Sequence, residues 1–370
     1  MRKLLLKIVA AILFALVFTT ITACNNTPPE TDEVPSIKDD NILEENPEEI
    51  VPDETPEIDE PSIEEDDELV DDEILSPDEE IDSDKENTEE IQISKEAEII
   101  EYLNMVHKKN IERVWFSTYS NITQYYGYIF LYHGNKVTPK QEYVNIKYKS
   151  TRPGITRTKI DYIVIHDTGN NASSANAQKH SNYINSNPGV SWHYTVDMEG
   201  VFHQIPDNEV AYHAGDGLKP SGSYYYNSTY KKTSITGGNM NGIGIETCVN
   251  SGSDYTTTLF NTANLVSDLM IKYDLDIDDV KRHYDFSGKM CPQALIKSGS
   301  WDDFLDYVMI CYYYKTKLYD VSIEFISMSK YMDNSGRVNI KTPKGTKINY
   351  KAVIKYEGQV LEYEFASQVI

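Results

Sequence analysis

The stretch DYIVIHD at residues 161–167 is a run of apolar residues that ends on a histidine and an aspartate. An uninterrupted apolar run of this length is typical of a strand that is buried on both faces in the middle of an α/β sheet. The strand delivers His166 at its carboxyl end, where ligands and catalytic groups gather in such sheets. We therefore expect this strand at the centre of the fold and His166 in the functional site.

Helix and strand patterns alternate around this strand, from about residue 143 to 312. GIGIETCV, which begins at Gly242, predicts a second buried strand, and SWHYTVD followed by GVFHQI predicts a hairpin that turns at Glu199 and Gly200. Residues at helical spacing predict helices over 172–186, 255–273 and 301–311. The predicted fold class is therefore α/β.

Three residues of metal-ligand type are spread along this region: His166, His283 in KRHYDF and Cys291 in KMCP. Two imidazoles and one thiolate are the ligands that a catalytic zinc ion with one open position needs. Such a zinc ion lowers the pKa of a bound water to about 7, so convergence of the three residues predicts a hydrolase. The alternative is that hydrogen bonds satisfy the histidines and that the cysteine is a small buried hydrophobe.

Six motifs occur in one order and with coherent spacing: TRPG, IVIHDTGN, SWHYTVD, AYHAGDG, GIGIETCVN and RHYDFSGKMCP. Together they resemble the zinc-dependent N-acetylmuramoyl-L-alanine amidases of the type 2 family, which are kin to phage endolysins and peptidoglycan recognition proteins. The resemblance covers residues 143–312 and implies a central mixed β-sheet flanked by helices. It also implies cleavage of the amide between the lactyl group of muramic acid and the L-alanine of the stem peptide.

The resemblance further implies roles for individual residues. His166, His283 and Cys291 match the family's ligands of Zn²⁺. Glu246 matches the acidic catalytic position, where a carboxylate accepts the proton of the attacking water and passes it to the departing amine. Lys289 matches a lysine that stabilises the oxyanion. For both charged residues, the ordinary alternative is a side chain that simply faces solvent.

Two other positions differ from the family's commonest pattern. His213 in AYHAG resembles a histidine near the substrate, although Tyr212 replaces the commoner tryptophan, so we predict that it contacts substrate or supports a ligand. Some relatives carry a catalytic tyrosine just before the HY of the second strand. Here that residue is Trp192, which has no acidic hydroxyl, and Glu246 is the better candidate.

Residues 1–23 have the features of a lipoprotein signal peptide. Positive charges at Arg2, Lys3 and Lys7 precede an apolar run that is too short to span a bilayer comfortably. The small residues before Cys24 resemble a lipobox, in which this cysteine becomes the lipidated first residue of the mature protein. The alternative is an ordinary signal peptide or a short membrane anchor. The prediction is export and attachment at the extracellular face of the cytoplasmic membrane, next to the cell wall.

Residues 24–92 differ in composition from the rest of the chain. They hold 30 Asp and Glu residues against two lysines, with repeated prolines and no aromatic residue. Such a segment cannot bury enough apolar surface to offset its ordering entropy, which predicts a disordered acidic tether. The chain's net charge of −25 belongs to this tether and says nothing about the substrate. We predict no nucleic-acid partner.

Two smaller regions flank the amidase-like region. Residues 93–142 contain a predicted helix over 94–114 and a strand-like segment, and they carry no recognisable chemistry. Residues 316–370 alternate with period two between Gly-containing turns, which predicts a small antiparallel β module, a sandwich that resembles bacterial immunoglobulin-like domains. The two remaining cysteines, Cys248 and Cys311, either pair in the exported protein or remain buried thiols.

The leading functional hypothesis is a membrane-tethered, monomeric, zinc-dependent amidase that acts on peptidoglycan. One alternative is a non-catalytic peptidoglycan receptor of the same fold, and another is a surface adhesion protein in which the β module matters most. Receptors that only bind often lack the cysteine ligand, so the combination of Cys291, Glu246 and Lys289 favours catalysis.

Overall fold

The computed structural model describes residues 94–117 and 123–370. The predicted signal peptide at 1–23, the predicted lipidation site Cys24 and the predicted tether at 24–92 lie outside the described residues. Across the described ranges, no helix is both long enough and apolar enough to cross a bilayer.

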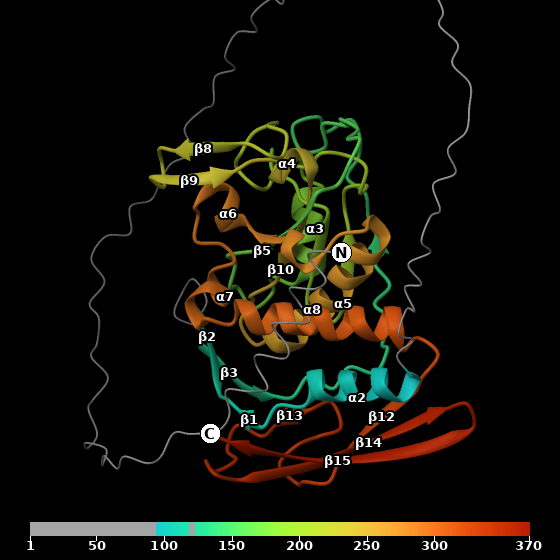
Figure 1. Cartoon of the computed structure of the whole chain (residues 1–370). Coiled ribbons are helices and arrows are strands. Elements are labelled where there is room, and N and C mark those ends of the chain that lie inside the picture. The colour runs from blue at the N-terminus through green and yellow to red at the C-terminus, as the bar shows by residue number, and fades with distance from the viewer. Residues whose placement is uncertain (1–93, 118–122) are drawn as a thin grey trace, which may run out of the picture. The chain divides into compact units, whose positions relative to one another are not determined.

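A six-stranded mixed sheet forms the centre of the fold (Figure 1). Its strands are β4 (Lys140–Gln141), β5 (Tyr162–Asp167), β6 (Tyr194–Val196), β7 (Val201–His203), β10 (Gly242–Thr247) and β11 (Val280–Arg282). They lie in the order β11–β5–β10–β6–β7–β4, and β5 is parallel to both of its neighbours. β6 and β7 pair antiparallel, as the predicted hairpin requires. The predicted α/β class and mixed sheet are confirmed.

Strand β5 is buried, as the apolar run predicted. Successive side chains of a strand point to opposite faces of its sheet. Ile163 and Ile165 belong to the main apolar core, whereas Val164 belongs to a smaller cluster on the other face. His166, two residues after Val164, therefore emerges on the face away from the main core.

The described ranges contain the four predicted helices, three of them with shifted ends, and four short helices that were not predicted. They are α2 (Lys95–Val106), α3 (Ala177–Ile184), α4 (Gly238–Asn241), α5 (Tyr255–Tyr273), η1 (Ile277–Asp279), α6 (His283–Ser287), α7 (Gln293–Ser298) and α8 (Trp301–Lys317). The bounds of α5 are those predicted, because the Asp254 side chain accepts hydrogen bonds from the first turn. Helix α3 begins later than predicted, where Asn176 provides its cap. Helix α8 continues past 311, because buried residues recur as far as Tyr314.

The C-terminal strands form an antiparallel sheet, as predicted. It contains β12 (Ser322–Ser327), β14 (Lys347–Tyr356) and β15 (Gln359–Val369), with β1 (Asn110–Ile111) added at its edge. A separate sheet joins β13 (Arg337–Val338) to β3 (Thr123–Tyr128) and β2 (Val114–Ser117). Strands of 316–370 therefore pair with strands of 93–142, which sequence patterns alone did not indicate.

Helix α2 lies between α8 and the C-terminal sheet (Figure 1). Helix α2 ends at Val106 and not at the predicted 114, because the chain turns there to form β1. Buried residues of α2, such as Ile99, share one apolar core with Ile163 of the central sheet and Ile348 of β14. A helix thus covers the C-terminal sheet, and residues 316–370 do not form a sandwich by themselves. A truncation near 315 would expose this shared core.

Candidate metal centre

The three predicted metal ligands lie together in the structure. One ligand atom each of His166, His283 and Cys291 lies within 4.8 Å of the other two. The two Nδ1 atoms of the histidines are 3.1 Å apart, and Sγ of Cys291 is 3.9 Å from Nδ1 of His166. Donors of a tetrahedral zinc site, with bonds of about 2.0–2.3 Å, are separated by about 3.3–3.6 Å. The three donors therefore fit a single ion of this size.

The sheet topology explains why these residues meet. His166 lies at the carboxyl end of β5, and β11 pairs directly beside β5, so that α6 begins with His283 next to the end of β5. The chain then returns to the same place, because the backbone N–H of Tyr284 donates to the carbonyl of Cys291 at 2.9 Å. Two adjacent strands and one tight loop thus supply all three donors.

The burial of the three residues sets their protonation. Burial lowers the pKa of His166 well below its usual value, and the neighbouring His283 lowers it further. Burial likewise lowers the pKa of His283 to about 3. Both imidazoles are therefore neutral at pH 7, with lone pairs free to coordinate. Burial raises the pKa of the Cys291 thiol well above its usual value, so a thiolate here needs a cation beside it.

The other edges of the two imidazoles are occupied by the protein. Nε2 of His166 is 3.1 Å from Nδ1 of His213, and the His283 ring hydrogen-bonds the backbone of Ala214. Partners of this kind fix the tautomer and orientation of metal-binding histidines. They leave both Nδ1 atoms facing the shared point. The structure thus places His213 behind the candidate ligand His166, and its contact with substrate stays a prediction.

One supporting residue was not found by sequence reasoning. The side-chain oxygen of Asn239 accepts hydrogen bonds from the backbone N–H groups of His213 at 2.7 Å and Ala214 at 2.6 Å. Asp216 in turn accepts hydrogen bonds from the backbone N–H groups of Gly238 at 2.7 Å and Asn239 at 3.1 Å. Asn239 therefore holds the segment that contacts both histidine ligands. An amide on a four-residue helix carries no motif that could have indicated this.

Glu246 lies beside the cluster. It pairs in register with His166 on the neighbouring parallel strand, and its Oε1 is 3.9 Å from Nδ1 of that histidine. The side chain is 14% exposed, and within the described ranges its Oε2 has no hydrogen-bond partner. Burial raises the pKa of Glu246 well above its usual value and the charge of Asp167 raises it further, whereas Lys289 opposes the shift. A buried carboxyl with a free oxygen beside a metal site is suited to proton transfer.

Lys289 is exposed on the loop between His283 and Cys291. Its charge lowers the pKa of His166 and of Glu246, so the ammonium group lies within electrostatic range of the cluster. The predicted action of Lys289 on the oxyanion stays a prediction.

A cavity of about 600 Å³ opens next to Glu246. Its other lining residues come from the loop after β5, from α3 and from the segment before β6: Thr168, Asn170, Lys179, His180, Asn182, Tyr183 and Trp192. The indole N–H of Trp192 donates to Oγ1 of Thr195 at 2.6 Å, which fixes the ring as part of the wall. This cavity offers room for a substrate group beside the metal centre.

Gly244 makes the contact between His213 and His166 possible. A Cβ atom at this position would lie 2.7 Å from ring atoms of His213. Replacing Gly244 with alanine is expected to push the His213 ring away and to lower the free energy of unfolding by about 1–3 kcal/mol. Urea denaturation measures this loss. Gly200→Ala is the control: nothing lies within 4 Å of its added Cβ, and we expect a change within about 0.5 kcal/mol. Equal losses in both variants would contradict the prediction.

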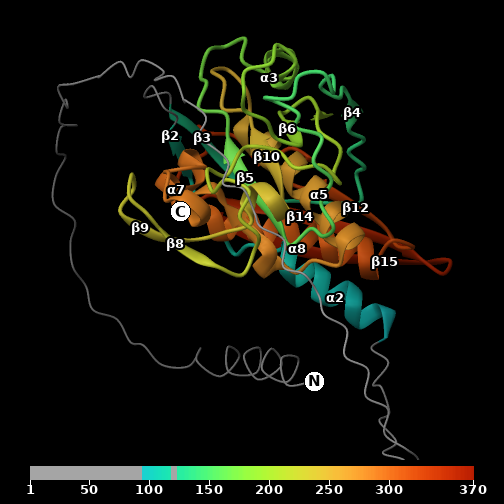
Figure 2. The same cartoon turned by 90° about the horizontal axis from the view of Figure 1, so that it is seen from above.

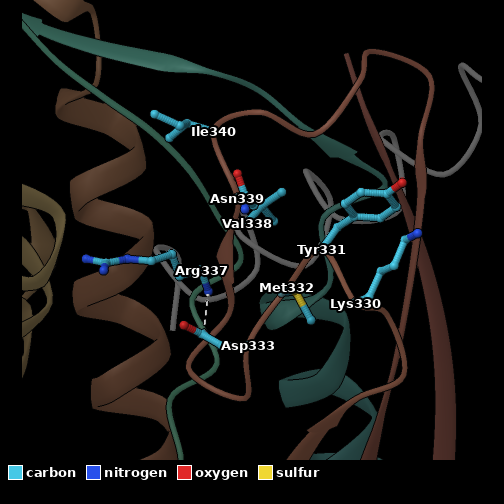
Figure 3. A pocket seen from close by; sticks show the side chains of 8 residues that line it. All are labelled: Lys330, Tyr331, Met332, Asp333, Arg337, Val338, Asn339 and Ile340. Carbon is cyan, nitrogen blue, oxygen red and sulfur yellow. Dashed lines mark hydrogen bonds between the residues drawn. The ribbon is translucent and has the colours of Figure 1, made fainter.

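A second hollow, of about 450 Å³, lies on the C-terminal segment between Lys330 and Ile340 (Figure 3). Its acidic residue, Asp333, accepts a hydrogen bond from the backbone N–H of Arg337 at 3.1 Å. The guanidinium of Arg337 pairs with Asp254, the cap of α5. Both charges therefore serve the fold, and this hollow has no reactive cluster among the described residues.

The two remaining cysteines that the structure describes, Cys248 and Cys311, are buried free thiols. They do not form the disulfide that sequence reasoning left open.

Comparison with known proteins identifies the central region. Residues 156–294 match the family described as N-acetylmuramoyl-L-alanine amidase. The chain is 35% identical to the N-acetylmuramoyl-L-alanine amidase XlyA of Bacillus subtilis (strain 168) over 156 residues, which is 42% of this chain and 46% of that protein. It is 33% identical to the N-acetylmuramoyl-L-alanine amidase CwlH of the same organism over 171 residues, which is 46% of this chain and 60% of that protein.

The chain is also similar to a solved structure, that of the catalytic domain of XlyA. The sequence identity is 31%, the match covers 46% of this chain and 99% of that one, and the TM-score is 0.40. The chain spans about half the length of the curated relatives it matches.

Proposed function

We propose that residues 156–294, which match the N-acetylmuramoyl-L-alanine amidase family, form a domain that hydrolyses peptidoglycan. The bond to be cleaved is the amide between the lactyl group of N-acetylmuramic acid and the L-alanine of the stem peptide. We propose Zn²⁺ as its cofactor, with His166, His283 and Cys291 as the ligands.

One observation carries this proposal. Three donors within 4.8 Å of one another lie beside Glu246, whose Oε2 has no partner in the described part of the chain and which borders a cavity. A buried carboxyl oxygen without a partner lowers the stability of the fold, and groups of this kind are concentrated at functional sites. A metal site alone would support many roles, but a metal site with an adjacent base and room for a substrate supports hydrolysis.

Each residue of the site would have a separate role in the reaction. Zinc held by three such ligands would supply Lewis-acid chemistry, polarising a carbonyl and making water a better nucleophile. Glu246 would accept the proton of the attacking water through Oε2 and then donate it to the departing amine of L-alanine. The Lys289 ammonium would stabilise the negative charge that develops on the former carbonyl oxygen. His213 would keep His166 oriented throughout.

The test is digestion of a defined muropeptide followed by mass spectrometry of the products. We expect one new free L-alanine amino terminus and one free lactyl carboxylate per cleavage. A non-catalytic receptor of the same fold would bind the muropeptide and leave its mass unchanged. Cleavage at a different bond would contradict the proposed specificity.

Asn239→Ala tests the support of the histidine ligands. Because the backbone N–H groups of His213 and Ala214 would lose their acceptor, we expect zinc affinity to fall by about 10- to 100-fold. Competition with a chelator of known affinity measures this change without relying on activity. Asn261→Ala is a comparison, because the side-chain amide of Asn261 also hydrogen-bonds the backbone, but it donates to the carbonyl of Asp197, away from the centre. Unchanged zinc affinity in Asn239→Ala would contradict the assigned role.

We further propose that the enzyme works outside the cell, held by a lipid on Cys24 and extended from the membrane by the acidic segment at 24–92. The support for this is the order of charge, apolar run and cysteine in the sequence. Metabolic labelling with a fatty acid is expected to label the unchanged protein and to leave Cys24→Ala unlabelled.

A further inference from the structure

A two-stranded hairpin projects beside the proposed active site (Figures 1 and 2). It consists of β8 (Tyr224–Asn227) and β9 (Lys232–Ile235), which form a two-stranded sheet of their own within the described ranges. An isolated two-stranded hairpin is at best marginally stable in water, so contacts with the rest of the domain must hold it.

The two faces of β8 differ sharply. Tyr224 is 74% exposed and Tyr226 is 64% exposed, and their spacing of two residues places them on the same face. Tyr225, between them, points the other way, and its hydroxyl donates to the carbonyl of Phe286 at 2.6 Å. One tyrosine therefore anchors the hairpin, and two present their rings to solvent.

The hairpin is fastened to the loop that carries the metal ligands. The Lys232 ammonium donates to the carbonyl of Tyr284 at 3.0 Å, next to His283. A Cβ atom on Gly288 would lie 2.9 Å from Cβ of Tyr230, so the hairpin lies against the residue that precedes Lys289. The exposed tyrosines are thus part of a hairpin that is attached next to the proposed active site.

The hairpin and the cavity lie on different sides of the metal centre. The hairpin contacts α6, which follows β11, whereas the cavity is bordered by Glu246 of β10 and by Trp192, which precedes β6. Strand β5, with His166, stands between β11 and β10 in the sheet. A substrate that crosses the metal centre can therefore reach the cavity on one side and the hairpin on the other.

The composition of the hairpin indicates its partner. Residues 218–236 contain four tyrosines and three lysines, with no acidic residue. Tyrosine rings offer rigid, amphipathic surfaces at little entropic cost, which suits stacking on the flat apolar faces of sugar rings. The lysines favour the approach of a polymer whose stem peptides carry carboxylates.

We propose that Tyr224 and Tyr226 form a platform that binds the sugar backbone of peptidoglycan, while the cavity beside Glu246 receives the stem peptide. This inference rests on the proposed function and names the part of the substrate that each side binds. It predicts that the hairpin matters for a polymeric glycan and not for a substrate that carries a single sugar.

The test compares Tyr224→Ala/Tyr226→Ala with the unchanged full chain. Binding to purified peptide-free glycan strands is expected to weaken at least about tenfold. Tyr224→Phe/Tyr226→Phe keeps the rings and is expected to retain most of the binding. Tyr319→Ala removes a tyrosine that is 76% exposed elsewhere on the surface and is expected to have no effect.

Hydrolysis of N-acetylmuramoyl-tripeptide by the same proteins completes the test. The double alanine variant is expected to cleave this single-sugar substrate at the unchanged rate, which also shows that the variant folds. Absence of glycan binding by the unchanged chain, equal binding by the double alanine variant, or loss of binding in the phenylalanine variant would overturn the platform. Failure of every variant to cleave the tripeptide substrate would instead overturn the proposed function. The glycan-binding results would still decide whether the platform exists, because they do not depend on cleavage.

Discussion

Cys291→Ser is expected to lower kcat/KM for muropeptide cleavage by at least about a thousandfold, which corresponds to about 4 kcal/mol of transition-state stabilisation. The serine oxygen binds zinc far more weakly than a thiolate, so the site would retain only two good ligands. Treatment with EDTA is expected to abolish activity in the unchanged protein, and added Zn²⁺ is expected to restore it. Elemental analysis should find one zinc per chain before treatment and none bound tightly by the variant.

Cys311→Ser is the matched control. Cys311 is also a buried free thiol, but it lies on α8 away from the ligand cluster. A hydroxyl in an apolar setting is expected to cost about 1–3 kcal/mol of stability, with zinc content and kcat/KM unchanged below the unfolding transition. Full zinc content and activity in Cys291→Ser would remove this residue from the metal site.

Glu246→Gln is expected to lower kcat by about 10²- to 10⁴-fold, because the amide can neither accept the water's proton nor pass it to the leaving amine. The two side chains have nearly the same shape, so zinc content should be unchanged. Single-turnover kinetics on the muropeptide, together with metal analysis, separates a lost base from a lost ion.

Glu209→Gln serves as the control for charge and burial. Its side chain is 14% exposed, as is that of Glu246, but its carboxylate pairs with Arg152 at 2.6 Å. We expect reduced stability, from the loss of a partly buried ion pair, and kcat within about twofold of the unchanged protein. A similar fall in kcat for both variants would indicate a general effect of buried charge and would contradict a special role for Glu246.

Some of the fold followed from local patterns. The apolar run of β5, the bounds of α5 and the turn between β6 and β7 depend on periodicity, capping residues and turn residues that lie close together in the chain. The ends of α2 and α8 did not follow, because neighbouring strands and a shared core decided where these helices stop. Pairing of β1 with β15 and of β13 with β3 joins residues more than 200 positions apart, and no local pattern encodes such pairing.

The candidate site was likewise predictable in part from the sequence and in part only from the tertiary structure. The sequence by itself determined which residue types were available: two histidines and a cysteine in motifs, one glutamate on an apolar strand and one lysine in a short loop. Only the tertiary structure decided that Glu246 stands in register with His166, that His213 reaches His166 over Gly244, and that Asn239 holds the supporting segment. The physical reason is that coordination and hydrogen bonding depend on distances of a few ångströms, and these arise from strand register and packing between segments far apart in the chain.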